Sequence, residues 1–323
     1  DVTGDRERPS VKVLFARTKN TALAAGSGGR FDAAALEDTA QAVAGFAARM
    51  RQEYHVPAER LYVVGSSGLF SALAGNQNAI AANKQALAAA VRGACGLPVQ
   101  FIDVRREVEL SLEGTIPVRD ADGAVLFDIG GGNTKGGYRD GKNLVSAGIP
   151  FGSLTFTDLV KKHARDGGFA ATAEGLRGEV LVPALRKALA GKPGFTERDR
   201  VFLSGGACWA LATLIRPGDR GDYVALTAAD IDAYRKLLLD ARGAFPAPDL
   251  ASVGDPAARE AARMEIEQVR GVYKPEQLLA GAEILQALAG ELGFAGGKKV
   301  YFARNAQVAW ILAYVAEKAG GGR

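Results

Sequence analysis

A glycine-rich turn that begins at Asp128 is the segment of this sequence best suited to bind an anion. An apolar run leads into the turn and an extended segment follows it, which predicts a strand, a tight turn and a returning strand. Successive backbone N–H groups in such a turn form a concave anion site, and Asp128 could hold Mg²⁺ or a metal-bound water. A plain hairpin with a glycine bulge is the alternative. The candidate phosphate-binding residues of the turn are Gly130, Gly131, Gly132, Asn133, Thr134 and Lys135.

Small residues also follow two other predicted strands, where the chain turns into a helix. Ser66 and Ser67 lie in the first of these turns, and their hydroxyl groups could donate to a phosphate chain or cap the next helix. Gly205 and Gly206 open a helix in the second turn, where an anion or part of a nucleotide could approach closely. Close packing of the helix on the sheet is the structural alternative. All four residues are candidate phosphate-binding residues.

Strands and helices alternate along the chain, which predicts an α/β layered fold. Apart from the two strands beside the Asp128 turn, the predicted strands are 11–17, 21–25, 61–64, 99–104, 143–147, 200–203 and 299–302. The predicted helices are 33–54, 80–95, 105–112, 153–163, 173–190, 207–215, 228–241, 256–269, 275–292 and 306–318. Each half of the chain begins with short strands and then alternates helices with strands. Two such units facing one another would make a cleft between two lobes.

Length and composition indicate an ordinary soluble protein with two lobes or domains. The chain has 323 residues and a net charge of +4. It contains no dense Lys/Arg run, so we expect no nucleic-acid partner, whereas a modest positive charge suits a polyanionic phosphate ligand. The longest apolar stretch near the end, 306–316, is too short to span a bilayer, so we expect no membrane partner. Two cysteines and two histidines cannot build a Cys/His metal cluster.

The first residue bears on the compartment, because the chain begins with Asp1 rather than Met. If Asp1 is the mature end left by a cleaved signal, we expect export, to the periplasm for example. Otherwise the expected compartment is the cytoplasm.

Four segments, taken in chain order, resemble the exopolyphosphatase/guanosine pentaphosphate phosphohydrolase (Ppx/GppA) family of the actin/hexokinase/Hsp70 superfamily. The turn at 128–134 resembles that family's Asp-Ile-Gly-Gly-Gly-Ser-Thr loop, and 203–206 resembles its strand-to-helix Gly-Gly turn. Segment 92–99 resembles the family's Thr-Gly-Leu-Pro-Ile step, and 279–285 its Ala-Gly-Ala-x-Ile-Leu signature. These segments occur in the family's order, and the resemblance that they carry extends over nearly the whole chain.

The resemblance implies an α/β fold of two actin-like (ribonuclease H-like) lobes with an interlobe cleft. The expected lobes are 1–118 and 119–323, with the last helix able to pack back on the first lobe. The resemblance also implies Mg²⁺ as cofactor, hydrolysis of terminal phosphoryl groups and a possible homodimer. Glu107 carries over as the general base, and Asp128 as a catalytic residue that binds Mg²⁺ or orients water. For Glu107 the structural alternative is one more charge on a solvated helix.

Some positions depart from the family's pattern of charges. Where the family has an Asp-x-Gly turn after its first strand, this chain has Arg17 and Lys19, which could contact phosphate directly. The segment 67–70 lacks the family's arginine, and Glu109 replaces the arginine of the general-base motif. Lys135 replaces an acidic residue. It could substitute in part for the charge of a metal, or mark a site that holds an anion without turning it over.

Three hypotheses follow from these residues. The first is a phosphohydrolase that releases terminal phosphate from polyphosphate or a pppGpp-like phosphoanhydride. The second is a regulatory protein that binds polyphosphate or nucleotides without hydrolysing them. The third is a kinase of the same superfamily, which the altered turn near Lys19 disfavours because ATP would need that turn.

Overall fold

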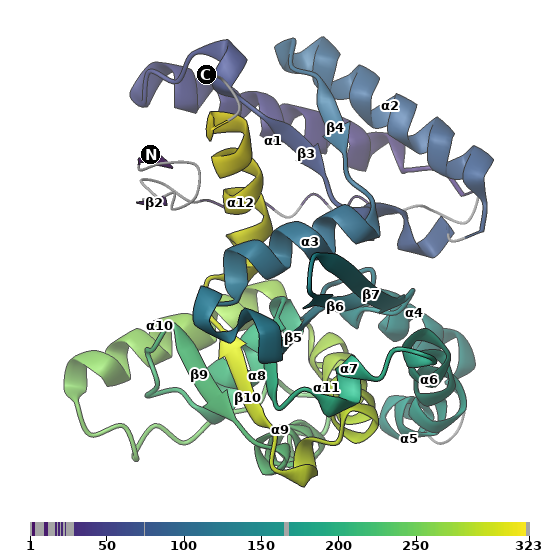
Figure 1. Cartoon of the computed structure of the whole chain (residues 1–323), viewed down its shortest axis with the longest axis vertical. Coiled ribbons are helices and arrows are strands. Elements are labelled where there is room, and N and C mark those ends of the chain that lie inside the picture. Colours follow the sequence, from purple (N-terminus) through teal and green to yellow (C-terminus); the bar gives the residue numbers. More distant parts are fainter. Residues whose placement is uncertain are drawn as a thin grey trace. The chain divides into compact units, whose positions relative to one another are not determined.

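The computed structural model describes residues 2–3, 10–11, 17, 19, 21, 23, 29–73, 75–164 and 168–320 (Figure 1). The chain separates into two compact units. Unit 1 consists of Asp1–Glu107 and Ile311–Arg323, and unit 2 of Val108–Trp310. A compact unit is not the same thing as an independently folding domain, so the domain boundary expected at 118/119 stays a prediction.

Unit 1 packs two long helices against a small parallel sheet of strands β3 and β4. Its helix α1 begins after Asp32, whose carboxylate accepts the Ala35 N–H at 2.9 Å, and α2 ends at Gly96 in the left-handed conformation. Both helices were expected from the sequence, and both are confirmed. The elements of unit 1 are β1 (Val2–Thr3), β2 (Ser10–Val11), α1 (Ala33–Glu53), η1 (Ala58–Arg60), β3 (Val63–Gly65), η2 (Ser67–Leu73), α2 (Gln77–Cys95) and β4 (Val99–Phe101). The strands predicted at 11–17 and 21–25 fall largely outside the described residues.

Unit 2 contains a six-stranded sheet with the order β7-β6-β5-β8-β10-β9. Strands β5, β8 and β10 run parallel to one another, so their carboxyl ends share one edge of the sheet, where α/β folds bind ligands. The strands are β5 (Ala124–Ile129), β6 (Thr134–Asp140), β7 (Asn143–Ile149), β8 (Arg200–Ser204), β9 (Tyr223–Leu226) and β10 (Lys299–Ala303). The short antiparallel strand β9 has no counterpart among the predicted strands.

The two faces of the sheet in unit 2 contact different helices, as the alternation of side chains along a strand requires. On β5, Val125, Phe127 and Ile129 join the large core beneath α8 and α11, while Ala124 and Leu126 point to α3. The connecting helices are α3 (Val104–Thr115), η3 (Val118–Gly123), α4 (Ser153–His163), α5 (Gly168–Leu176), η4 (Arg177–Leu181), α6 (Val182–Leu189), α7 (Gly194–Glu197), α8 (Gly206–Ile215), α9 (Ala228–Asp240), α10 (Pro256–Val272), α11 (Pro275–Leu292), η5 (Phe294–Gly296) and α12 (Ala306–Gly320). Helix α3 begins in unit 1, and α12 continues into it.

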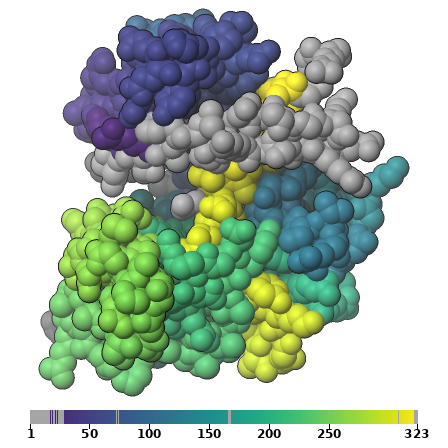
Figure 2. Space-filling model, turned by 90° about the vertical axis from the view of Figure 1, so that its left-hand side faces the viewer, coloured from purple at the N-terminus to yellow at the C-terminus, as the bar shows by residue number. Residues whose placement is uncertain are grey.

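Helices α10 and α11 show how burial follows the sequence pattern. Ala262, Ile266 and Val269 form the one buried stripe of α10, and the rest of that helix lies on the surface of unit 2, in light green in Figure 2. Helix α11 is buried along most of its length, including the carboxylate of Glu283. None of the helices within the described residues is both long and apolar enough to cross a membrane.

The single helix predicted over 173–190 is wrong in one respect, because a π-helical turn separates α5 from α6. Pro183 has no N–H group and cannot donate to the carbonyl four residues earlier. The preceding residue, Val182, donates to the carbonyl of Arg177, five residues back, which is the π pattern. The helix therefore continues through the proline with one widened turn.

Candidate functional site

The end of strand β5 brings Asp128 next to two polar side chains. Asp128 lies directly opposite Lys135 on the antiparallel strand β6 and opposite Ser204 on the parallel strand β8. Lys135 Nζ is 2.7 Å from Asp128 Oδ2, and Ser204 Oγ donates to Asp128 Oδ1 at 3.1 Å. Lys135 also donates to the side-chain carbonyl of Asn133 at 3.3 Å. Both oxygens of the carboxylate are thus engaged by the protein.

The glycine turn is fixed by the first turn of helix α4. The N–H of Ser153 donates to the carbonyl of Gly130 at 3.0 Å, and the N–H of Leu154 donates to that of Gly131 at 2.9 Å. The hydroxyl of Thr155 donates to the carbonyl of Gly132 at 3.0 Å. The donor groups at the N-terminus of α4 therefore form hydrogen bonds to carbonyl oxygens of the turn.

This arrangement determines where the N–H groups of the turn point. In a trans peptide the N–H is directed away from the carbonyl of the same peptide unit. Since the carbonyls of Gly130 and Gly131 face α4, the N–H groups of Gly131 and Gly132 point away from it. Neither N–H group has an acceptor in the described part of the chain. Successive donors of this kind form an anion-binding concavity.

Thr134 anchors the loop before α4, and its expected contact with phosphate stays a prediction. Its hydroxyl donates to the carbonyl of Phe151 at 2.8 Å, and its side chain is buried. Asn133 is also buried, with its amide oxygen on the Lys135 ammonium. The turn therefore presents backbone donors and one cation to a ligand, and the side chains of Asn133 and Thr134 hold these groups in position.

Gly152 is needed because the glycine turn rests directly on it. A Cβ at this position would lie 2.3 Å from the carbonyl oxygen of Gly130 and 2.6 Å from that of Gly131. Its φ of −124° suits any residue, so the constraint is contact alone. The Gly152→Ala variant is expected to lose about 1–3 kcal/mol of unfolding free energy and to displace the turn.

Urea unfolding of Gly152→Ala measures this loss, and Gly290→Ala is the matched control. Gly290 is exposed on α11 with open space around the added methyl group, so alanine there should be neutral or stabilise by up to about 1 kcal/mol. Equal stability of the two variants would contradict the contact argument.

The two glycines after β8 are explained by contacts inside the protein. Gly205 has a φ of +91°, and a Cβ there would lie 2.3 Å from the carbonyl of Ile129 and 2.5 Å from Asp128 Oδ1. A Cβ on Gly206 would lie 1.7 Å from the hydroxyl oxygen of Tyr273, which covers the start of α8. Close packing therefore accounts for both positions, and their contact with phosphate stays a prediction.

A buried thiol and phenol lie behind Asp128. Burial, and then the charge of Asp128, raise the pKa of the Cys208 thiol well above its usual value. Burial also raises the pKa of Tyr273 to about 12, with smaller contributions from Cys208 and Asp128. Both groups therefore stay neutral at physiological pH, and Cys208 is not an activated nucleophile.

The raised pKa of Cys208 predicts slow alkylation. At about pH 8 a thiol with a raised pKa has little thiolate, which is the reactive form. Iodoacetamide should therefore modify Cys95, which is only partly buried, before Cys208 in the native protein. Mass spectrometry of timed samples measures both rates, with urea-unfolded protein as the control in which both react. Equal rates in the native protein would contradict the prediction.

In unit 1 the structure brings together three of the residues singled out in the sequence. Asp103 caps α3 by accepting the N–H of Arg106 at 2.7 Å, and this places Glu107 in the first turn. Ser66 Oγ donates to Glu107 Oε1 at 2.9 Å, and Ser67 Oγ donates to Oε2 at 2.7 Å. The N–H of Ser67 donates to the same Oε2 at 3.0 Å. Glu107 is only 2% exposed, so it is not a charge on a solvated helix face.

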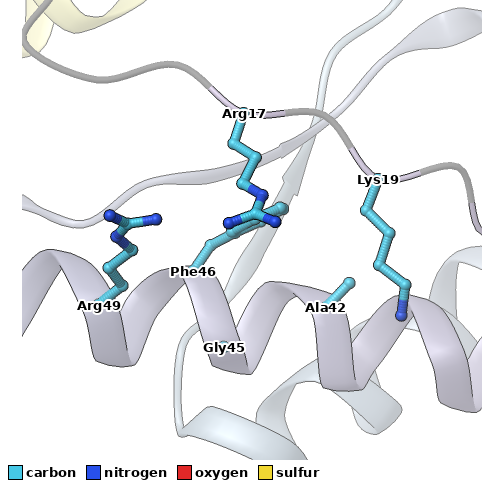
Figure 3. Close-up of a pocket in the computed structure, with 6 residues that line it drawn as sticks. All are labelled: Arg17, Lys19, Ala42, Gly45, Phe46 and Arg49. Atoms are coloured by element: carbon cyan, nitrogen blue, oxygen red, sulfur yellow. The ribbon is translucent and has the colours of Figure 1, made fainter.

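Lys19 lies apart from this cluster, over helix α1. Its ammonium is 2.5 Å from a carboxylate oxygen of Asp38. With Arg17 and Arg49 it lines a cavity of about 370 Å³ on α1, in which the three cationic side chains project from two segments (Figure 3). The remaining lining residues are Ala42, Gly45 and Phe46. A phosphate contact of Lys19 stays a prediction.

The donor set near Asp128 does not suit Mg²⁺. A hard divalent cation needs several oxygen ligands, usually including carboxylates. Asp128 Oδ2 already pairs with the ammonium of Lys135, and a second cation at that carboxylate would be repelled. Within the described ranges no group of three or more His, Cys, Asp or Glu residues could hold a metal ion. The Mg²⁺ site proposed from the resemblance therefore has no fitting set of ligands around Asp128.

Sequence reasoning missed several residues that build the site. Ser204 was inside a recognised motif but was not singled out, although the aligned ends of β5 and β8 would have paired it with Asp128. Gly152 and Thr155 carried no visible signal, because their role depends on how α4 meets the turn. Tyr273 lies far along the chain, and only the structure places it on Gly206.

No protein-family model matches this sequence, and neither does any curated protein. Solved structures do match. The PPX-GPPA enzyme of Aquifex aeolicus is similar with a TM-score of 0.63 and 19% sequence identity, over 97% of this chain and 93% of that chain. An exopolyphosphatase from Cytophaga hutchinsonii has a TM-score of 0.58 and 16% identity, over 90% of this chain and 86% of its own.

A protein described as exopolyphosphatase-like gives a third match, with a TM-score of 0.62 and 16% identity over 90% of this chain and 87% of that chain. At these identities the likeness is one of fold. The chain has the fold of Ppx/GppA proteins, and the fold class predicted from the sequence, α/β with two actin-like lobes, is confirmed.

Proposed function

We propose that this protein binds a phosphoanhydride chain, inorganic polyphosphate or a pppGpp-like compound, and releases its terminal phosphate. The observation that carries the proposal is the pair of N–H groups of Gly131 and Gly132, directed away from α4 in the turn that also holds the Lys135 ammonium. Two amide donors and a cation suit a phosphate group. The solved structures of similar fold named as exopolyphosphatases support the choice of ligand class.

In the proposed reaction a water molecule attacks the terminal phosphorus. A new P–O bond forms to the water oxygen, and the bond to the bridging oxygen breaks. Glu107 takes a proton from the water as general base, and the products are inorganic phosphate and a chain shorter by one unit. The hydrogen bonds from Ser66 and Ser67 hold the Glu107 carboxylate in one orientation.

Binding without hydrolysis is the second candidate, and one observation favours it. Each carboxylate oxygen of Glu107 and Asp128 already accepts a hydrogen bond from the protein or pairs with its ammonium group. Neither carboxylate therefore has an oxygen that is reserved for a water molecule. A regulatory binder of polyphosphate or nucleotides would need only the amide donors and Lys135.

Calorimetric binding and phosphate release, measured for polyphosphate and for pppGpp, test these candidates. Release above the rate without protein supports the phosphohydrolase. Tight binding with no release supports the regulatory binder. The absence of both binding and release, for both ligands, would contradict the two candidates together. A nucleotide-dependent phosphorylation of a small molecule would instead favour a superfamily kinase.

A further inference from the structure

Lys135 places its ammonium group inside the glycine turn and away from bulk solvent. Its side chain is 4% exposed, and its Nζ contacts Asp128 Oδ2 and Asn133 Oδ1. The pairing is built into the sheet, because Asp128 and Lys135 are direct partners across β5 and β6. A cation is therefore fixed in the same turn as the amide donors of Gly131 and Gly132.

The surroundings of Asp128 favour this ammonium over a divalent metal. Oδ1 of Asp128 accepts the Ser204 hydroxyl, while Oδ2 pairs with Lys135. To bind here, Mg²⁺ would have to displace the cation that already holds its carboxylate ligand. An ammonium is a compact point charge that serves phosphate sites without metal.

We propose that Lys135 is the built-in counterion of this turn, so that the turn binds phosphoanhydride chains that carry no divalent cation. Asp128 is then an internal competitor, which holds the ammonium until a phosphate oxygen replaces the carboxylate. The inference rests on the proposed function, because it takes the turn to be the phosphate site. It adds that the ligand is the metal-free polyanion and that Asp128 weakens its binding.

Isothermal titration of tripolyphosphate into the full chain tests the inference, once with excess EDTA and once with millimolar MgCl₂. We expect binding in EDTA and no gain from MgCl₂. Asp128→Asn should bind about tenfold more tightly, the scale of one charge-assisted hydrogen bond. The reason is that Lys135 loses its internal competitor, while asparagine can still accept the Ser204 hydroxyl. If Asp128 held a metal ion instead, this variant would lose binding.

Two further variants complete the experiment. Asp128→Asn combined with Lys135→Met removes both charges together, and its affinity should fall by at least about tenfold. Lys142→Met removes an exposed lysine from the turn between β6 and β7 and should bind like the wild type. The double variant keeps the net charge of the wild type, whereas Lys142→Met lowers it by one. Unchanged affinity in the double variant with a loss in Lys142→Met would mean that net charge alone attracts the ligand, and would overturn the inference.

The outcomes separate the inference from the proposed function. Binding that requires MgCl₂, or that Asp128→Asn abolishes, would overturn the inference and leave the proposed function standing. No binding by the wild type in either buffer would overturn both. If circular dichroism shows that Asp128→Asn is unfolded, the wild type in the two buffers and the neutral double variant decide the matter.

Discussion

Replacing Glu107 by glutamine is expected to slow phosphate release from polyphosphate by about 10²–10⁴-fold, the range that a general base contributes. The amide has nearly the same shape as the carboxylate but cannot take a proton from water. Ser66 and Ser67 can still hold it, with one serine hydroxyl turned to accept from the new NH₂ group. Steady-state phosphate release measures the effect, and calorimetric binding of tripolyphosphate should stay close to the wild-type value.

Glu109→Gln is the matched control for this variant. Glu109 lies on the same helix, is partly exposed and pairs with Arg139 at 3.3 Å. Loss of a partly exposed ion pair has a small effect, so this variant should keep the wild-type rate within about a factor of two. Equal losses in the two variants would show that the charge of α3, and not a base at position 107, supports the reaction. An unchanged rate in Glu107→Gln would place the base elsewhere.

The candidate site was predictable where it depends on local pattern. An apolar run before 130–133 and an extended segment after it define a hairpin, and counting outward from that turn pairs Asp128 with Lys135. The ion pair between them could therefore have been found from the sequence by register alone. The three residues Ser66, Ser67 and Glu107 were identified separately, and their mutual hydrogen bonds follow only from how β3 meets α3.

The direction of the glycine N–H groups could not be predicted. It depends on the carbonyls of Gly130 and Gly131 facing α4, and that contact is possible because Gly152 has no side chain. A glycine-rich motif indicates that such a turn can form, but it does not tell which side of each peptide faces the ligand. Only tertiary packing decides that.

Strand β9 and the π turn before Pro183 were not predicted, because each leaves only a weak pattern in the sequence. Strand β9 has four residues and lies at the sheet edge, where only Val224 and Leu226 are buried. Its four residues, Tyr-Val-Ala-Leu, are a short apolar run without alternating polar residues, and periodicity alone does not distinguish such a run from part of a helix. The π turn before Pro183 is a small adjustment of helical hydrogen bonds, and apolar periodicity does not report it.

Replacing Glu283 by alanine is expected to lower the unfolding free energy by about 3–5 kcal/mol, the scale for breaking a buried ion pair by removing one partner. Glu283 is fully buried on α11 and accepts from Arg177 and Arg235, each at 2.7 Å. These arginines come from η4 and α9, so one carboxylate joins three helices of unit 2. Both guanidinium groups are partly exposed and keep contacts to Glu174, so the loss should fall toward the lower end of that range.

Glu291→Ala on the same helix separates this effect from the loss of any ion pair. Its partner Arg186 is largely exposed, so the pair contributes at most about 1 kcal/mol. Urea unfolding of both variants, with the slope m checked against the wild type, gives the two free energies. If Glu283→Ala lowers the unfolding free energy no more than Glu291→Ala does, then water solvates Arg177 and Arg235 at no free-energy penalty. In that case apolar packing alone would hold α11 in place. A much larger cost for Glu283→Ala is expected, because its fully buried carboxylate makes the 2.7 Å contacts to both arginines where α11, α9 and η4 meet, and its loss leaves them the longer contacts to the largely exposed Glu174.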